Sequence, residues 1–145
     1  MTEAAKSILV PVDGSPAALR AAEHAIVLLH AGLAQRAILL NVQPPVMAGD
    51  ISSLVPVDTV QRARILQGEL LMAPARKLFA DAGLEHVLRI ELGDPGETIA
   101  AAAAGNDCTH IVLGTRGLGR IASLVLGSVA NKVVHLSQVP VTLVR

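Results

Sequence analysis

The sequence predicts a single open α/β domain, residues 1–145, built on a five-stranded parallel sheet with helices on both faces. Its length of 145 residues and its 52% hydrophobic content fit one compact domain. Short runs of Val, Ile and Leu alternate with stretches of helical periodicity, and this order is typical of βαβ units. The runs are continuously apolar, as expected of strands buried on both faces. They are Ser7–Asp13, Ala37–Val42, His86–Leu92, His110–Gly114 and Val139–Val144.

Capping sequences predict where two of the helices begin. Ser15-Pro16 places a hydroxyl at the N-cap and proline at the first helical position. Asp94-Pro95-Gly96-Glu97 repeats this arrangement and adds a glutamate placed for a capping box. The first helix is expected to run from Pro16 to about His30 and to end near Gly32. Helical spacing predicts that its buried stripe consists of Leu19, Ala22, Ile26 and Leu29.

A longer helix is predicted from about Asp58-Thr59 to Asp81-Ala82-Gly83. Pro74 lies inside it and is expected to kink the helix or to end its first half, because proline lacks the N–H that continues the helical ladder. Residues 44–57 contain three prolines and are expected to form a long loop, a kind of segment that often serves as a lid or binding element. The apolar positions of the helix include Ile65, Leu66, Leu70, Leu78 and Phe79.

Charge and composition exclude several classes of function. Twelve basic and twelve acidic side chains give a net charge of zero, which argues against nucleic acid as the partner. Aromatic side chains that could stack on the bases of single-stranded nucleic acid are scarce as well, since the chain has no Trp, no Tyr and one Phe. No run approaches the roughly 18 apolar residues of a membrane span, and the N-terminal residues do not resemble a signal peptide. Cys108 is the only cysteine, so a reducing, cytoplasmic location is expected.

A glycine-rich loop follows the fourth predicted strand. It reads Gly114-Thr115-Arg116-Gly117-Leu118-Gly119, and Gly127-Ser128 then opens a helix predicted over residues 129–137. Glycines let backbone N–H groups approach an oxyanion, and a helix N-terminus adds partial positive charge. Arg116 adds a full positive charge. The sequence therefore predicts a site for a phosphate chain.

Two common phosphate motifs fit this loop poorly. A Walker A loop requires Gly-Lys followed by Ser or Thr, whereas Gly119 is followed by Arg120-Ile121. Residues 117–122 match the dinucleotide pattern with alanine in its last place, but no acidic residue follows them to bind a ribose. A tight turn without a ligand is a third interpretation.

A different spacing fits without a gap: Gly114, two residues, Gly117, nine residues, then Gly127-Ser128. It resembles the nucleotide-binding signature of the ATP-binding branch of the universal stress protein family. The resemblance covers almost the whole chain. Further segments that match the family in order are Ile8–Ser15, Leu39–Val42, Gly93–Pro95, Leu126–Ala130 and Val139–Val144.

The resemblance implies an adenine nucleotide alpha hydrolase-like fold with strand order 3-2-1-4-5 and a nucleotide cleft at the carboxyl ends of strands one and four. Open α/β sheets bind ligands at such a switch point. ATP, with Mg²⁺, is the implied ligand. Asp13 would hold the ribose or the adenine edge, and the backbone of Pro11, Val12 and Val42 would line the base pocket. The residues implied around the phosphates are Gly114, Arg116, Gly117, Gly127, Ser128 and Val129.

The resemblance further implies a nucleotide-dependent regulatory or stress-response module. No motif for nucleophilic catalysis is present, and Cys108 and His110 lack partners at zinc-ligand spacing, so neither catalytic residues nor a protein-held metal are predicted. Two alternatives stay open: a slow ATPase or nucleotide-transferring enzyme, and a dimeric adaptor that acts without nucleotide. A homodimer through residues 139–144 is expected, because an apolar edge strand invites pairing with a second copy.

Several site residues also have simpler interpretations. Asp13 precedes Gly14 and could form a turn. Ser15 and Ser128 could be helix N-caps, and Ser128 could combine that role with a phosphate contact. Arg116 could be a solvated loop charge.

Overall fold

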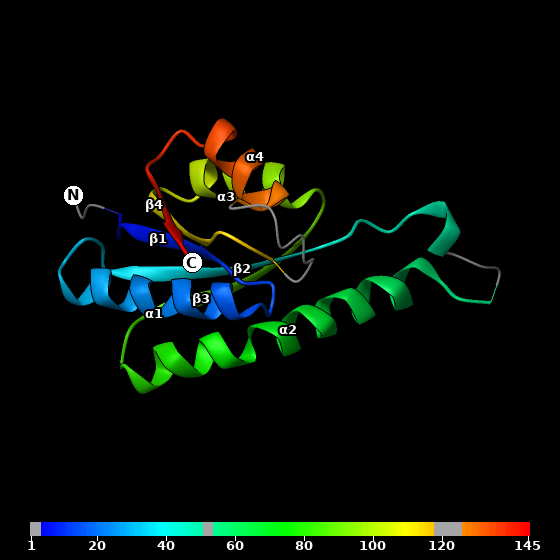
Figure 1. Ribbon diagram of the computed structural model, residues 1–145. Helices are drawn as coiled ribbons and strands as arrows, with labels where there is room; N and C mark the ends of the chain where they lie inside the picture. The colour runs from blue at the N-terminus through cyan, green and yellow to red at the C-terminus, as the bar shows by residue number, and fades with distance from the viewer. Residues whose placement is uncertain (1–3, 51–53, 118–125) are drawn as a thin grey trace.

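The computed structural model describes residues 4–50, 54–117 and 126–145. Its five parallel strands lie in the order β3-β2-β1-β4-β5, which confirms the predicted fold class and strand order. Helices α1 and α2 cover one face of the sheet, and α3 and α4 cover the other (Figure 1). The strands are β1 Ser7–Pro11, β2 Arg36–Gln43, β3 His86–Leu92, β4 Cys108–Gly114 and β5 Val141–Val144. The helices are α1 Pro16–His30, α2 Val57–Asp81, α3 Pro95–Gly105 and α4 Ser128–Leu136, with a 3-10 turn at Ala48–Asp50.

β1 is the central strand, and all five of its residues are buried. Its side chains alternate between the two cores of the domain. Ile8 and Val10 pack in the core under α1 and α2, whereas Leu9 packs in the core under α3 and α4. Burial on both faces explains why this strand is a continuous apolar run in the sequence.

Some predicted boundaries differ from the structure. β1 ends at Pro11 rather than at Asp13, so Val12 and Asp13 lie just beyond the carboxyl end of the strand. β5 begins at Val141 rather than at Val139. The preceding residue, Pro140, has no N–H to donate to a ladder, and its carbonyl accepts a bond of 3.0 Å from the N–H of Ile111.

The buried face of α1 consists largely of alanines. Of the predicted stripe, Ala22 and Leu29 are buried, whereas Leu19 and Ile26 are half-buried at the margin of the same core. Small side chains let the helix axis approach the sheet closely, which moves the larger residues to the flanks. The buried residues of α1 are Ala17, Ala18, Ala21, Ala22, Ala25 and Leu29.

α2 is one continuous helix, so of the two effects expected of Pro74, a kink or an end to the first half of the helix, the second does not occur. Because Pro74 has no N–H, the carbonyl of Leu70 lacks its helical hydrogen-bond partner. Both residues lie on the exposed face of α2, where water can bond that carbonyl. The buried residues of α2 are Gly68, Met72, Ala75 and Phe79, and of the apolar positions noted in the sequence only Phe79 is fully buried. No helix of the described residues is long and apolar enough to cross a membrane.

Candidate functional site

A pocket of about 260 Å³ lies at the carboxyl ends of β1 and β4, where the chain reverses its winding direction. Its volume is close to the lower end of the roughly 300–1,000 Å³ typical of small-molecule sites. Every residue of the implied nucleotide site lines it: Pro11, Val12, Asp13, Val42, Gly114, Arg116, Gly117, Gly127, Ser128 and Val129. The implied site residues come from four separate segments of the sequence, and the tertiary structure brings them together around one pocket.

The pocket also has residues that sequence reasoning did not select. Leu40, Ile99 and Leu113 form an apolar part of its wall, and Ser15, Ala18, Pro95, Thr115 and Ala130 complete it. Leu113 lies near the carboxyl end of β4, one of the two strands at the switch point, and that position could have indicated it from the sequence. Leu40 lies on β2, the neighbour of β1. None of the described residues of the loop 44–56 lines the pocket. The 3-10 turn Ala48–Asp50 and the first half of α2 project from the body of the domain (Figure 1).

A buried amide network holds the segment after β1 in place. The Asn41 side-chain N–H donates to the carbonyl of Val12 at 2.7 Å, and the Gln43 amide donates to the Asn41 Oδ1 at 2.8 Å. The N–H of Val12 donates to the carbonyl of Leu40 at 2.8 Å. Both polar groups of the Val12 backbone are thus bonded, which fixes the direction in which Asp13 leaves the sheet.

Asp13 does form the turn that its sequence context allows. Its Oδ1 accepts a bond of 2.9 Å from the N–H of Ser15. The second oxygen faces the glycine loop, since a Cβ added at Gly117 would lie 2.8 Å from Oδ2. The turn leaves one carboxylate oxygen beside the pocket as an acceptor for a ligand hydroxyl.

Ser15 is the N-cap of α1, as predicted. Its Oγ accepts from the N–H of Ala18 at 3.1 Å and donates to the carbonyl of Arg116 at 3.3 Å. One buried hydroxyl therefore joins the first turn of α1 to the glycine loop.

The start of α4 differs from the expectation for Ser128. Gly127 is the N-cap and Ser128 is the first helical residue, so the interpretation of Ser128 as an N-cap was wrong. The N–H of Gly127 donates to the carbonyl of Thr115 at 2.7 Å, which ties the helix start to the end of β4. Among the described residues no side chain caps α4, whereas Ser15 and Asp94 cap α1 and α3. The first N–H groups of α4 therefore point out of the helix beside the pocket and have no side-chain partner in the described part of the chain.

Close packing against α1 requires glycine at position 114, and the sequence alone did not show this requirement. A Cβ at this position would lie 2.8 Å from the carbonyl carbon of Ala17 and 3.0 Å from the nitrogen of Ala18. Glycine is needed here because α1 lies directly against the end of β4. Residues 118–125, which include the rest of the predicted glycine-rich loop, lie outside the described part of the chain.

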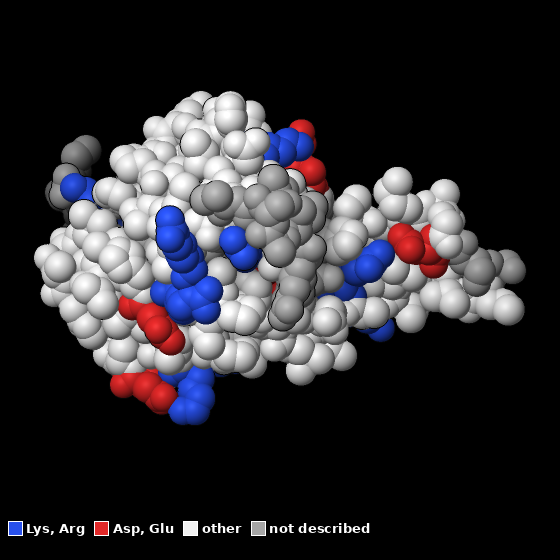
Figure 2. Space-filling model, in the orientation of Figure 1, with Lys and Arg blue, Asp and Glu red and all other residues white. Residues whose placement is uncertain are grey.

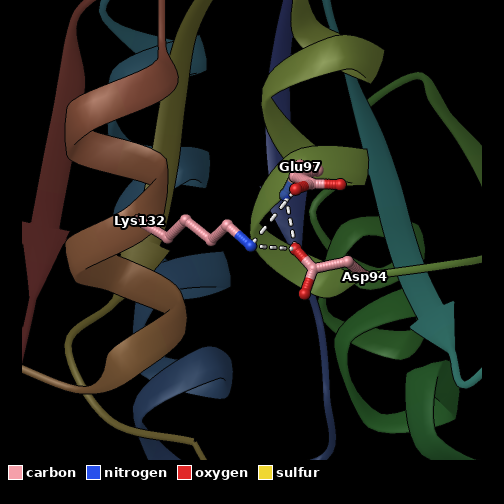
Figure 3. Close-up of polar contacts among 3 residues, drawn as sticks. All are labelled: Asp94, Glu97 and Lys132. Carbon is pink, nitrogen blue, oxygen red and sulfur yellow. Dashed lines mark hydrogen bonds and ion pairs between the residues drawn. The ribbon is translucent and has the colours of Figure 1, made fainter.

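An ion pair links α3 to α4 beside the pocket. Lys132 Nζ lies 3.0 Å from Asp94 Oδ2 and 3.4 Å from Glu97 Oε1 (Figure 3). Asp94 also caps α3 by accepting from the N–H of Glu97 at 3.0 Å. This backbone bond, followed by the bond from Lys132, lowers the pKa of Asp94, and the bond to Asp94 raises the pKa of Lys132. The contact connects the helices that carry Pro95 and Ser128, two residues of the pocket wall.

A Lys132→Met variant should be less thermally stable than the natural protein at neutral pH, and the difference should shrink in acid. Because the pKa of Asp94 is lowered in the folded protein, its contribution to folding stability is present above the ordinary aspartate pKa. That contribution is lost as the pH falls through the pKa of Asp94 in the folded protein. Because the pKa of Lys132 is raised in the folded protein, its contribution to folding stability is lost only as the pH rises through that raised pKa. The difference should therefore be constant from about pH 5 to 9 and should decline below about pH 4.

Circular dichroism melts across this pH range measure the difference, and methionine keeps the methylene packing of Lys132 on Gly96. Arg76→Met is the matched control, because Arg76 is exposed and forms no ion pair with a described residue. A Lys132→Met difference that stays unchanged down to pH 3 would contradict this assignment.

Cys108 and His110 lie in β4, away from the pocket lining. Cys108 is a free, buried cysteine, and burial raises the pKa of its thiol. Among the described residues, no group of three or more His, Cys, Asp or Glu side chains could hold a metal ion.

Comparison with known proteins agrees with this architecture. The profile of the Universal stress protein family matches residues 4–145. A Thermus aquaticus protein described as "Universal stress protein in QAH/OAS sulfhydrylase 3'region" is 37% identical over 140 residues, which cover 97% of this chain and 98% of that protein.

Solved structures show the same fold. The universal stress protein UspA from Lactobacillus plantarum superposes with a TM-score of 0.81 at 23% identity, covering 99% of this chain and 100% of that one. A universal stress protein in complex with cAMP superposes with a TM-score of 0.71 at 26% identity, covering 99% of both chains. The family match spans nearly all of the sequence and includes every segment that lines the pocket, so the chain belongs to the universal stress protein family.

Proposed function

We propose that this protein binds an adenine nucleotide, ATP with Mg²⁺, in the pocket between β1 and β4 and acts as a nucleotide-dependent regulatory or stress-response module. The observation that carries the proposal is the convergence of all ten implied site residues on one pocket. The cAMP complex of a similar universal stress protein supports an adenine nucleotide as the ligand. The single cysteine and the family membership support a cytoplasmic protein.

The lining residues suit the parts of such a ligand. Leu40, Val42 and Ile99 offer an apolar surface for a base, and Oδ2 of Asp13, which faces the glycine loop, can accept from a ribose hydroxyl. The uncapped N–H groups of α4 and the guanidinium of Arg116 can bind the phosphates. Mg²⁺ would neutralise phosphate charge and would be held mainly by phosphate oxygens and water, because Asp13 is the one carboxylate among the described lining residues.

The same inventory favours binding over rapid hydrolysis. The described lining contains no His, Cys, Lys or Glu, and one oxygen of Asp13 is already bonded to the N–H of Ser15. A general base for an attacking water would have to be Asp13 alone. We therefore expect less than one phosphate released per chain during a binding experiment; release over many turnovers would favour the ATPase alternative.

Calorimetric titration of nucleotide-stripped protein tests the binding proposal. ATP with Mg²⁺ should bind saturably at one site per chain, ADP and AMP should compete with it, and NAD should give no heat. A melt at high ATP should accompany the titration, since ligand at 100 times its Kd adds about 2.7 kcal/mol of stability. Absence of both heat and a melting shift would overturn the proposal in favour of the adaptor that acts without nucleotide.

We also propose that two copies pair through β5. This strand lies at the edge of the sheet and pairs only with β4 among the described strands, and Leu143 is 39% exposed. Sedimentation should give the mass of two chains, and Leu143→Lys should shift it toward one chain. Val27→Lys is the control, because Val27 is 59% exposed and lies on α1 rather than on β5. A monomeric natural protein would contradict this arrangement.

A further inference from the structure

A second cavity, of about 280 Å³, adjoins the glycine loop. Its described lining consists of Ala17, Arg20, Thr115, Arg116 and Arg145. Thr115 and Arg116 line the nucleotide pocket as well, so this short segment separates the two cavities. Basic side chains gather on this face around the position at which Figure 1 marks the C-terminus (Figure 2).

The backbone beneath these arginines is held by bonds between three elements. Gly114 of β4 pairs with Val144 of β5, and the N–H of Thr115 donates to the carbonyl of Val144 at 2.8 Å. Arg116 and Arg145 are therefore carried by neighbouring strand ends. The Nε of Arg20 donates to the main-chain oxygen of Arg145, which brings α1 to the same place.

No described acidic side chain forms an ion pair with this cluster. No acidic residue belongs to the described lining of the cavity either. Ion pairs elsewhere engage Arg64, Lys77, Arg89 and Lys132. Like charges that line one cavity repel, and an anion between them would relieve that repulsion.

We propose that Arg20, Arg116 and Arg145 form a second anion site, which binds a phosphate group outside the nucleotide pocket. The planar guanidinium donates paired hydrogen bonds that match two phosphate oxygens, and guanidinium groups from different elements can hold different edges of the anion. Such a phosphate has two sources. It is either the terminal phosphate of a nucleotide whose base lies in the neighbouring pocket, or a free inorganic phosphate or pyrophosphate. The first source rests on the proposed function, whereas the second does not.

Titration with inorganic pyrophosphate at low ionic strength tests the site directly. The natural protein should bind pyrophosphate, and the double variant Arg20→Gln/Arg145→Gln should bind it about tenfold more weakly, because each change removes charge-assisted hydrogen bonds. Arg76→Gln on α2 is the matched control and should leave binding unchanged. Circular dichroism melts without ligand check that the variants are folded.

Equal pyrophosphate affinity in the natural protein and the double variant would overturn the proposal, as would absence of binding to the natural protein. A Gly127→Leu variant places a larger side chain in the lining of the nucleotide pocket and is expected to weaken ATP binding, but it should still bind pyrophosphate. If it loses pyrophosphate as completely as it loses ATP, the phosphate site is the glycine loop alone and the second site is refuted.

Nucleotide titrations of the double variant then distinguish the two sources. Weaker binding of ATP with unchanged binding of AMP assigns the site to the terminal phosphate of a nucleotide. Unchanged binding of both nucleotides, together with weaker pyrophosphate binding, assigns it to a free phosphate. If the natural protein binds no nucleotide, the proposed function fails. The pyrophosphate titration still shows in that case whether the second anion site exists.

Discussion

A Ser128→Asp variant is expected to lose affinity for ATP by roughly 10- to 100-fold while keeping its thermal stability. Ser128 is the first residue of α4 and lines the pocket beside the uncapped helix N-terminus. A carboxylate at this position interacts favourably with the helix dipole, so the fold should not suffer. The same carboxylate would repel the phosphates that are proposed to bind there. Calorimetric titration measures the affinity, and a melt without nucleotide measures the stability.

Ser128→Asn is the matched control, because asparagine has the shape of aspartate without its charge. It should bind ATP within a few-fold of the natural protein. The side chain of Ser128 is exposed, so neither substitution disturbs the core. ATP binding that is equal in the aspartate and asparagine variants would mean that the phosphates do not lie at the start of α4.

A Phe79→Ala variant is expected to lower the free energy of unfolding by about 3–5 kcal/mol. Phe79 is fully buried in the core between the sheet and helices α1 and α2, and it is the single phenylalanine of the chain. Its ring centroid lies 5.8 Å from that of His86, at the start of β3. Removing the ring leaves a cavity that surrounding alanines cannot fill. Urea denaturation followed by circular dichroism measures the change, since the chain has no Trp or Tyr for intrinsic fluorescence.

Two controls define this effect. Phe79→Leu keeps most of the volume and should cost less than half as much. Leu66 lies on the same helix and is 59% exposed. Leu66→Ala should therefore change the free energy of unfolding by no more than about 0.5 kcal/mol. A Phe79→Ala variant as stable as Leu66→Ala would contradict the assignment of Phe79 to the core.

The helix caps were predictable because they involve residues close together in the chain. Ser15 bonds the N–H of Ala18, and Asp94 bonds the N–H of Glu97, so a tetrapeptide contains all the relevant groups. The apolar strands were predictable for a similar reason, since burial on both faces leaves a continuous hydrophobic run. Their ends were less predictable: whether β1 stops at Pro11 depends on the bonds that Val12 makes with β2.

The candidate site was predictable as a set of positions but not as a shape. Family spacing selected Asp13, Gly117 and Ser128, and the pocket contains all of them. Spacing could not reveal that Gly127 rather than Ser128 caps α4, because the residue at which a helix begins depends on where Thr115 holds the chain. It could not reveal that Gly114 is also required by the approach of Ala17.

The sequence by itself determined the fold class, the order of the elements, the caps of α1 and α3 and the family of the chain. Only the tertiary structure decided which face of α2 is buried, what completes the pocket wall, and that Arg20, Arg116 and Arg145 meet around a second cavity. The physical reason is the range of the interactions. Caps and periodicity act within one or two helical turns, whereas burial, close approach and charge clustering arise between segments that folding alone brings together.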